Sequence, residues 1–423
     1  MKDKLIEPKN MKNIHRTNLA IFGGSPIRKT PFPVRFSFGT DERQIISDVI
    51  DYYENEQTDP GYQGKFEQLY TDAFVKYMGN TGFADAVSSG TAGLFVAIAA
   101  LQLPKKSSIL VSPVTDPGTI NAIILNNMIP VLMDSMPGSY NTGTEQIEER
   151  MKKDIRAAVI VHLGGKSTPI REITDRCNEC GIKVVEDCSQ AHGAIYRGNK
   201  VGTYGDIAVF STMYRKAHIT GGSGGVIYSQ DEELMHLARA YADRGKPYWK
   251  DDYDDRNPAQ FLFPALNFHQ NEISCAIGLK SLERLDKTIQ KRLLFLKKLS
   301  TSISEISQVC SPSIVSDDDS PFFYPISVKT DKINCSKIDF AKAILAEGIT
   351  INPHYQYVIS QWPWVRPYLF DDYPCTNAQN YCNSSFNVLL NENYGEQEVQ
   401  DITDAISKVE NAYHKLNQSE ARN

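Results

Sequence analysis

Three short apolar runs follow one another in the middle of the chain: AAVIVHL at 157–163, IKVVED at 182–187 and DIAVFS at 206–211. Four similar runs lie on either side of them, and helical patterns separate most of the runs: FADAV at 83–87, SILVS at 108–112, PVLMD at 130–134 and GGVIYS at 224–229. Strands that alternate with helices in this way are typical of a largely parallel sheet with helices on both faces. We therefore predict an α/β fold whose ligand site lies where the parallel strands end.

The segments before and after this region suggest three parts of the chain. Helical patterns at 41–54 and 65–79 precede it, and a long helical stretch at 271–306 follows it. A strand pattern, FFYPISVK, then occupies 322–329, with helical patterns at 337–348 and 396–416. We expect an N-terminal arm at 1–39, its first part mobile or strapped over a neighbouring subunit, a large α/β domain at 40–290, and a small α+β domain at 291–423.

Charge and hydropathy exclude several classes of protein. The 423 residues hold 51 acidic and 45 basic side chains, a net charge of −6, so no global basic field would attract nucleic acid or an anionic membrane. The N-terminus has no apolar leader pattern, and no stretch offers the roughly 18 uninterrupted apolar residues that a membrane span requires. We expect a cytoplasmic protein.

Eight cysteines are too dilute in this chain for a disulfide scaffold. Cys177 and Cys180 form a CxxC pair, but no second pair or nearby histidine completes a zinc site. We read the pair as a helix end before Gly181 and expect no metal site.

The first candidate for chemistry is SSGTAG at 88–93, between the run at 83–87 and an apolar helical pattern. Free backbone N–H groups and the positive end of the helix dipole suit a phosphate there. Taken alone the motif is weak, because Ser and Thr cap ordinary helices as well.

Two further candidates follow later apolar runs. Asp187 ends a run that predicts a buried strand, where a carboxylate needs a partner such as a protonated ring nitrogen, or else caps the next helix. Lys216 precedes the glycine-rich segment GGSGG at 221–225, and a desolvated lysine amine can attack an aldehyde. A lone lysine is usually a solvated charge, but the three motifs together match the phosphate, ring nitrogen and aldehyde of pyridoxal 5′-phosphate.

Nearly the whole chain resembles the DegT–StrS sugar aminotransferases, which are fold type I pyridoxal-phosphate enzymes with a mostly parallel central sheet and a smaller C-terminal domain. The resemblance rests on LAIFGGSPIR at 19–28, SSGTAGL at 88–94, VVEDCSQAHGA at 184–194, and GDIAVFS at 205–211 with the lysine after it. It implies that Lys216 forms the Schiff base and later moves the substrate proton. It also implies that Asp187 keeps the pyridine nitrogen charged.

The same resemblance implies the remaining cofactor contacts: Ser89, Gly90, Thr91, Asp116, Gln190, Ser211 and Asn267. Asn267 is at the position where the family serves the phosphate of the adjacent subunit, so a homodimer is implied. Asp116 is a departure, because the family commonly has an aromatic residue there that stacks on the ring. His269 is another, where the family usually has arginine. For the substrate, the resemblance points to His354 and Tyr355, and His162 follows a strand pattern near the cofactor.

These features favour transfer of an amino group from glutamate or glutamine to a keto-sugar, most simply one linked to a nucleotide. A pyridoxamine-dependent sugar dehydratase of the same family is an alternative, although those enzymes carry histidine in place of the lysine. A cofactor-binding regulator or degenerate homologue is another, motivated by Asp116 and His269. A nicotinamide-dependent oxidoreductase is disfavoured because no GxGxxG opens the first strand-to-helix unit.

Overall fold

The computed structural model describes residues 16–152 and 154–414. Its large sheet has seven strands in the order β1-β9-β8-β5-β4-β2-β3. Their bounds are β1 (Phe83–Val87), β2 (Ser108–Val111), β3 (Ile129–Leu132), β4 (Ile155–Val161), β5 (Lys183–Asp187), β8 (Ile207–Ser211) and β9 (Gly225–Ser229). Each predicted apolar run lies on one of these strands, and the neighbours from β8 to β3 pair in parallel. The predicted α/β fold is confirmed.

Strand β9 is the one member of this sheet that runs against the others, since it pairs antiparallel with both β8 and β1. The chain therefore leaves β8 and enters β9 at the same edge of the sheet. The whole connection at 212–224 stays at the edge where the parallel strands end. This reversal keeps Lys216 beside the other strand ends.

Helices cover both faces of the large sheet, as the continuous burial along its strands requires. Val209 faces one core with α4 (Gly90–Ala100), α5 (Pro117–Leu125) and α8 (Glu232–Ala242). Phe210, the next residue, faces the opposite core with α3 (Lys65–Met78) and α9 (Glu272–Glu283). Towards β3 this second face is covered by α6 (Thr144–Arg150) and α7 (Ile170–Glu179). Cys180 caps the end of α7 before Gly181, whose φ is 67°, as predicted.

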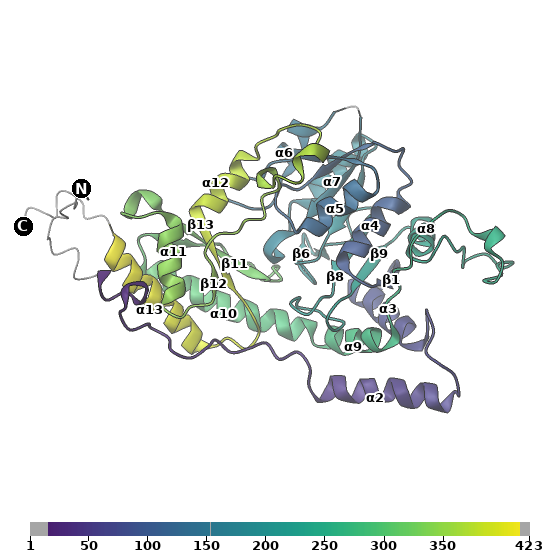
Figure 1. Cartoon of the computed structure of the whole chain (residues 1–423), viewed down its shortest axis with the longest axis horizontal. Coiled ribbons are helices and arrows are strands. Elements are labelled where there is room, and N and C mark those ends of the chain that lie inside the picture. The colour runs from purple at the N-terminus through teal and green to yellow at the C-terminus, as the bar shows by residue number, and fades with distance from the viewer. Residues whose placement is uncertain (1–15, 153, 415–423) are drawn as a thin grey trace, which may run out of the picture.

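The C-terminal part has its own antiparallel sheet, in the order β10-β11-β13-β12. Its strands are β10 (Cys310–Pro312), β11 (Phe323–Val328), β12 (Ile351–Asn352) and β13 (Ser385–Leu389). They share a core with α10 (Leu285–Ile306), α11 (Lys337–Ala346) and α13 (Glu396–Tyr413), and α12 (Thr376–Ser384) precedes β13. The boundary that we placed after residue 290 falls inside α10, which runs beneath both parts in Figure 1.

One further helix, a short hairpin and several 3-10 turns complete the described chain. They are α2 (Thr40–Asn55), the β6 (Ile195–Tyr196) and β7 (Asn199–Lys200) hairpin, and the 3-10 turns η1 (Ala20–Phe22), η2 (Leu163–Gly165), η3 (Pro258–Gln260), η4 (Thr330–Lys332), η5 (Ile359–Gln361) and η6 (Arg366–Tyr368). Helix α2 projects from the body at the lower edge of Figure 1. Among the described residues, no helix is both long and apolar enough to cross a membrane.

The described part of the N-terminal arm, residues 16–39, packs on the small domain of its own chain. Arg28 bonds Asp401 at 2.6 Å and Glu398 at 2.9 Å, both on α13. Further along the arm, Asn391 donates to the Pro33 carbonyl at 2.8 Å. Residues 1–15, for which we predicted mobility or a strap over another subunit, lie outside the described residues.

Candidate active site

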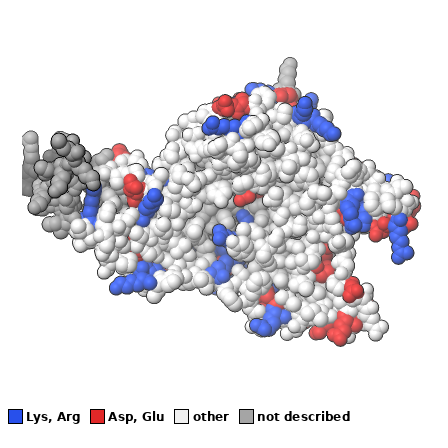
Figure 2. Space-filling view, in the orientation of Figure 1, with Lys and Arg blue, Asp and Glu red and all other residues white. Residues whose placement is uncertain are grey.

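The carboxyl ends of the parallel strands meet near the middle of the molecule, between the two sheets. Figure 2 shows this face hollowed at its middle, with a few acidic and basic atoms in the hollow. The strand ends bring Asp187, Ser211 and Lys216 to this edge, together with the N-terminus of α4. These are the segments that the sequence marked as candidates.

Lys216 is buried, with 9% of its surface exposed. Its Nζ lies 4.4 Å from the centre of the Phe322 ring, which belongs to the small domain. Burial lowers the pKa of the Lys216 ammonium to about 8, although the carboxylates of Asp187 and Asp116 oppose the shift. A lysine in this state loses its proton far more readily than a solvated one, as a nucleophilic amine must.

Asp187 is held in one orientation at the end of β5. Its Oδ2 accepts a hydrogen bond from the Thr119 hydroxyl at 2.8 Å, and its Oδ1 accepts one from the Ser189 amide at 3.1 Å. Thr119 is itself bonded to Thr115 at 2.7 Å. Only 3% of Asp187 is exposed, so the carboxylate is both oriented and shielded from water. A charged ring nitrogen is the type of partner that would offset its burial.

The N-terminus of α4 forms a narrow cradle. Ser89 caps the helix by accepting from the Ala92 amide at 3.0 Å, and the first-turn amides of Gly90 and Thr91 have no acceptor within the helix. Side chains are excluded around them, because a Cβ at Gly90 would lie 2.6 Å from the Cβ of Ser211. At Gly225 a Cβ would lie 2.7 Å from the Ser89 carbonyl oxygen. Backbone N–H groups and a hydroxyl therefore converge where a phosphate fits.

Three of the predicted residues lie around this centre. Asp116 is the exposed N-cap of α5, accepting from the Gly118 amide at 2.9 Å, and its charge acts on Lys216. Gln190 accepts from the Gly164 amide at 2.9 Å and bonds to the hydroxyl of Tyr355, which comes from the small domain. The Tyr355 contact thus joins the two domains at the site.

The structure places ring nitrogens of both histidines predicted to bind substrate, His162 and His354, against protein groups. His162 is fully buried, its Nδ1 accepting from the Thr168 amide at 3.1 Å and its Nε2 facing Glu186 at 3.0 Å, so its ring is enclosed by protein. His354 is bonded through Nδ1 to Lys337 at 3.1 Å, inside the small domain. Both residues follow strands as expected, but their rings turn to structural partners.

His162, Glu186 and Cys188 lie close enough together to suggest a metal site. Glu186, however, already accepts from three backbone amides, those of Gly202, Tyr204 and Gly205, besides facing His162. Burial raises the pKa of the Cys188 thiol well above its usual range. The Glu186 carboxylate is therefore held by protein donors, which is the arrangement of a structural network.

Asn267 lies next to the segment that leads into the α4 N-terminus, because the carbonyl of the adjacent Phe268 accepts from the Ser88 amide at 2.7 Å. It is exposed, and its side-chain amide donates to the Tyr62 hydroxyl at 3.1 Å. Next to it, His269 stacks on the Tyr62 ring at 4.3 Å and faces Asp243 at 3.0 Å. The position that the family usually gives to arginine is therefore filled by an anchored histidine.

Two site residues were missed by the sequence analysis. Phe322 covers the Lys216 amine, because its amide donates to the Gly164 carbonyl at 3.1 Å. Gly165 allows this close approach, since a Cβ there would lie 1.8 Å from the Ser320 carbonyl oxygen. Thr119, which orients Asp187, is the second site residue that the sequence analysis missed. The glycines of VHLGG at 161–165 were the available signal for the first.

Comparison with known proteins agrees with this geometry. A sequence profile described as the DegT/DnrJ/EryC1/StrS aminotransferase family matches residues 41–407. A GDP-perosamine synthase from Vibrio cholerae is 29% identical over 263 residues, which are 60% of this chain and 66% of that protein. The solved aminotransferase from Psychrobacter cryohalolentis has a TM-score of 0.81 at 23% identity, covering 90% of this chain and 98% of that one.

A second solved structure is similar to the chain over the same extent. It is E. coli GDP-4-keto-6-deoxy-D-mannose-3-dehydratase with bound hydrated PLP, at a TM-score of 0.80 and 20% identity. The alignment covers 89% of this chain and 99% of that one. One scaffold thus accommodates both an aminotransferase and a dehydratase, so the fold alone does not choose between them.

Proposed function

The chain belongs to the DegT/DnrJ/EryC1/StrS aminotransferase family, and from this premise we propose that it moves an amino group from glutamate or glutamine to a keto-sugar carried by a nucleotide. It is a pyridoxal-phosphate-dependent aminotransferase of fold type I, as the sequence indicated. The nucleotide sugar in the name of the Vibrio cholerae relative supports this choice of acceptor. Such a substrate would place the reaction in the cytoplasm.

The observation that carries the proposal is the meeting of three groups at one edge of the sheet. The α4 N-terminus offers backbone amides for a phosphate, Asp187 offers an oriented carboxylate for a ring nitrogen, and Lys216 offers a buried amine with a lowered pKa. When bound there, pyridoxal phosphate supplies an electron sink that stabilises negative charge at the carbon next to the transferred nitrogen.

Each residue then has a separate task. Asp187, fixed by Thr119 and Ser189, keeps a proton on the ring nitrogen. Lys216 in its neutral form takes a proton from the substrate and returns it, which a pKa of about 8 permits near neutral pH. Phe322 shields the amine from water.

The presence of Lys216 weighs against the dehydratase alternative, since the resemblance gives those enzymes histidine at that position. The nearby His218 does not replace it. Its Nε2 is bonded to the Tyr70 hydroxyl at 2.6 Å, and burial lowers the pKa of this histidine to about 3. His218 is therefore a neutral packing residue behind the site.

Adding an amino donor to the cofactor-loaded protein tests the proposal. We expect the yellow absorption of the loaded protein to disappear with glutamate or glutamine and to return when a nucleotide-linked keto-sugar is supplied. 2-Oxoglutarate alone, which offers no amino group, should leave the absorption unchanged. A spectrum that neither donor alters would contradict amino transfer and favour a non-catalytic regulator.

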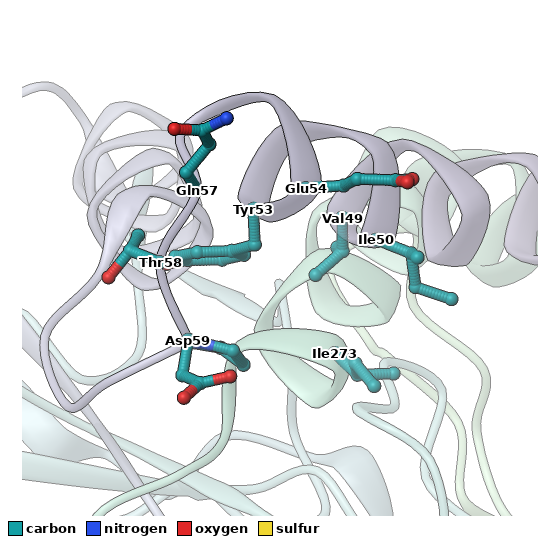
Figure 3. Close-up of a pocket in the computed structure, with 9 residues that line it drawn as sticks. Val49, Ile50, Tyr53, Glu54, Gln57, Thr58, Asp59 and Ile273 are labelled. Carbon is teal, nitrogen blue, oxygen red and sulfur yellow. The ribbon is translucent and has the colours of Figure 1, made fainter.

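We also propose that two copies of the chain form a homodimer and that Asn267 serves the partner's phosphate site. Asn267 is exposed, and its side-chain amide donates to the Tyr62 hydroxyl at 3.1 Å. Apolar side chains are also exposed on α2 and α9: Figure 3 shows Ile50 of α2 and Ile273 of α9 beside one groove, and 58% and 41% of their surfaces are exposed. A second copy would cover such a surface.

Mixed dimers test this arrangement. Neither Lys216→Ala nor Asn267→Ala protein should transaminate alone at the normal rate, but co-expression should restore about a quarter of the sites, because each mixed dimer keeps one site with both residues intact. Steady-state activity of the purified mixture measures the restoration. Pairing Lys216→Ala with Asp187→Asn is the matched control, since both residues belong to one chain's site and no dimer would be repaired. Absence of restoration in the first mixture would place Asn267 outside the partner's site.

A further inference from the structure

We propose that Arg35, in the N-terminal arm, is a positioning residue for Lys216, and that it acts as part of an ion-pair network formed by Arg35, Glu392 and Arg292. We call these three residues the arginine clamp. The inference rests on the proposed role of Lys216. It assigns a task to a part of the arm that lies outside the LAIFGGSPIR motif at 19–28.

Arg35 directly contacts the main chain of the connection at 212–224, which holds Lys216 and which we call the lysine loop. Its guanidinium donates to the carbonyl oxygens of Lys216 and Ala217, the latter at 3.1 Å, and to that of Tyr214 at 3.3 Å. Its Nε bonds the Glu392 carboxylate at 2.9 Å. The side chain therefore bridges the lysine loop of the large domain and the segment after β13 of the small domain.

The arm is held so that Arg35 points inwards. Asn391 donates to the Pro33 carbonyl at 2.8 Å and Asn393 donates to the Val34 carbonyl at 3.0 Å. Glu392, between these two asparagines, forms an ion pair with the Arg35 side chain. The sequence NEN at 391–393 thus holds three consecutive residues of the arm, through two hydrogen bonds to their carbonyl oxygens and one ion pair.

Arg292 extends the arginine clamp to the other wall of the site. It is 1% exposed, bonds Glu392 at 2.8 Å, and donates to the Pro321 carbonyl at 3.0 Å. Pro321 precedes Phe322, whose ring covers the Lys216 amine. The Glu392 carboxylate therefore pairs with both arginines. Arg35 contacts the lysine loop, and Arg292 contacts the residue before Phe322.

The residue types fit this task. An arginine fork can donate to several acceptors at fixed angles, whereas a lysine ammonium is a single point charge. Burial opposes ionisation of Glu392, but Arg292 and Arg35 outweigh it and lower the pKa of its carboxyl. The carboxylate consequently stays charged and keeps both arginines in place.

Positioning the lysine loop controls how well the Lys216 amine is shielded. The carboxylates of Asp187 and Asp116 interact electrostatically with this amine and favour its charged form. The charged amine in turn lowers the pKa of His192. Burial is the dominant cause of its lowered pKa. Loss of the clamp would let the loop and Phe322 move and water enter, so the pKa of the amine would rise towards that of a solvated lysine.

The test measures the Lys216 amine in cofactor-free, full-length protein. The protein is labelled with a small amine-reactive reagent across a pH series, and mass spectrometry measures the labelled fraction of the Lys216 peptide. The midpoint of this curve reports the deprotonation of the Lys216 amine. Arg35→Ala should raise this midpoint by about one pH unit or more. It should also weaken binding of pyridoxal phosphate about tenfold, because the amine is displaced. Arg35→Lys should not restore either value, since it keeps the charge but not the fork.

Arg28→Ala is the matched control. Arg28 lies in the same arm and pairs with Asp401 and Glu398, but it does not touch the lysine loop. It should leave the labelling midpoint unchanged. An equal rise in Arg28→Ala would show that general release of the arm is responsible, and would overturn the specific role of Arg35.

Glu392→Gln provides a second route, because it removes both ion pairs while keeping a similar shape. Its midpoint should rise in the same direction as that of Arg35→Ala, with thermal unfolding recorded to confirm that each protein is folded. Unchanged midpoints in folded Arg35→Ala or Glu392→Gln protein would overturn the proposal. Borohydride reduction of the loaded wild-type protein identifies the cofactor-bearing lysine separately, so failure of the proposed role of Lys216 would be recognised by a different peptide.

Discussion

Replacing Lys216 by alanine is expected to abolish both the yellow absorption of the loaded protein and transamination. The amine is buried beneath Phe322 and its pKa is lowered to about 8, so it combines nucleophilicity with a position facing Asp187 and Asp116. Alanine removes the nucleophile and the proton carrier together, which corresponds to a loss of several orders of magnitude in rate. Absorption spectra and steady-state rates of the two proteins measure the change.

Lys337→Ala is a matched control for this change. Lys337 is also buried, and burial lowers its pKa to about 8, but it lies in the small domain against His354. This variant should keep the yellow absorption even if it is less stable. A Lys216→Ala protein that still showed the absorption of a lysine-linked cofactor would assign the attachment to another lysine.

The same pKa sets a pH dependence. Lys216 is charged below a pH of about 8 and neutral above it, so covalent capture of the cofactor by cofactor-free protein should accelerate as the pH rises towards that value. The direction follows from burial, which disfavours the charged form of lysine.

The large sheet could be predicted from the sequence because its strands are buried on both faces. Runs such as AAVIVHL and IKVVED stand out as continuous apolar segments, and β4 and β5 lie on them. β13 was missed because Ser385 and Asn387 interrupt the apolar residues of SFNVL at 385–389, and its pairing with β11 is a long-range contact. The predicted boundary at residue 290 lies within α10, one continuous helix that runs from the large domain into the small one.

Residues after strands are easy to find, but the direction of their side chains is not. Asp187 and His162 both follow buried parallel strands, yet Asp187 is bound by Thr119 at the site edge while His162 turns to Glu186. Only the tertiary contacts distinguish these outcomes. Arg35 gave no signal at all, because it lies in an aperiodic segment and acquires its contacts from the distant Glu392.

Replacing Asp187 by asparagine is expected to leave the cofactor bound but to slow transamination on the order of a hundredfold or more. Asparagine has nearly the same shape, and its Oδ1 can still accept a hydrogen bond from Thr119 or Ser189. It carries no charge, so it cannot keep a proton on the ring nitrogen, and the ring would withdraw electrons poorly. Cofactor affinity and kcat, measured separately, distinguish a loss of chemistry from a loss of binding.

Asp116→Asn is the control that separates a specific carboxylate from general negative charge. Asp116 is exposed, caps α5 through the Gly118 amide, and also acts on the charge of Lys216. If negative charge near the lysine were sufficient, both variants would slow the reaction equally. We expect a much smaller effect at Asp116, because water screens an exposed carboxylate and asparagine can still cap the helix. Near-normal kcat in Asp187→Asn would remove this residue from its proposed task, whatever the result at Asp116.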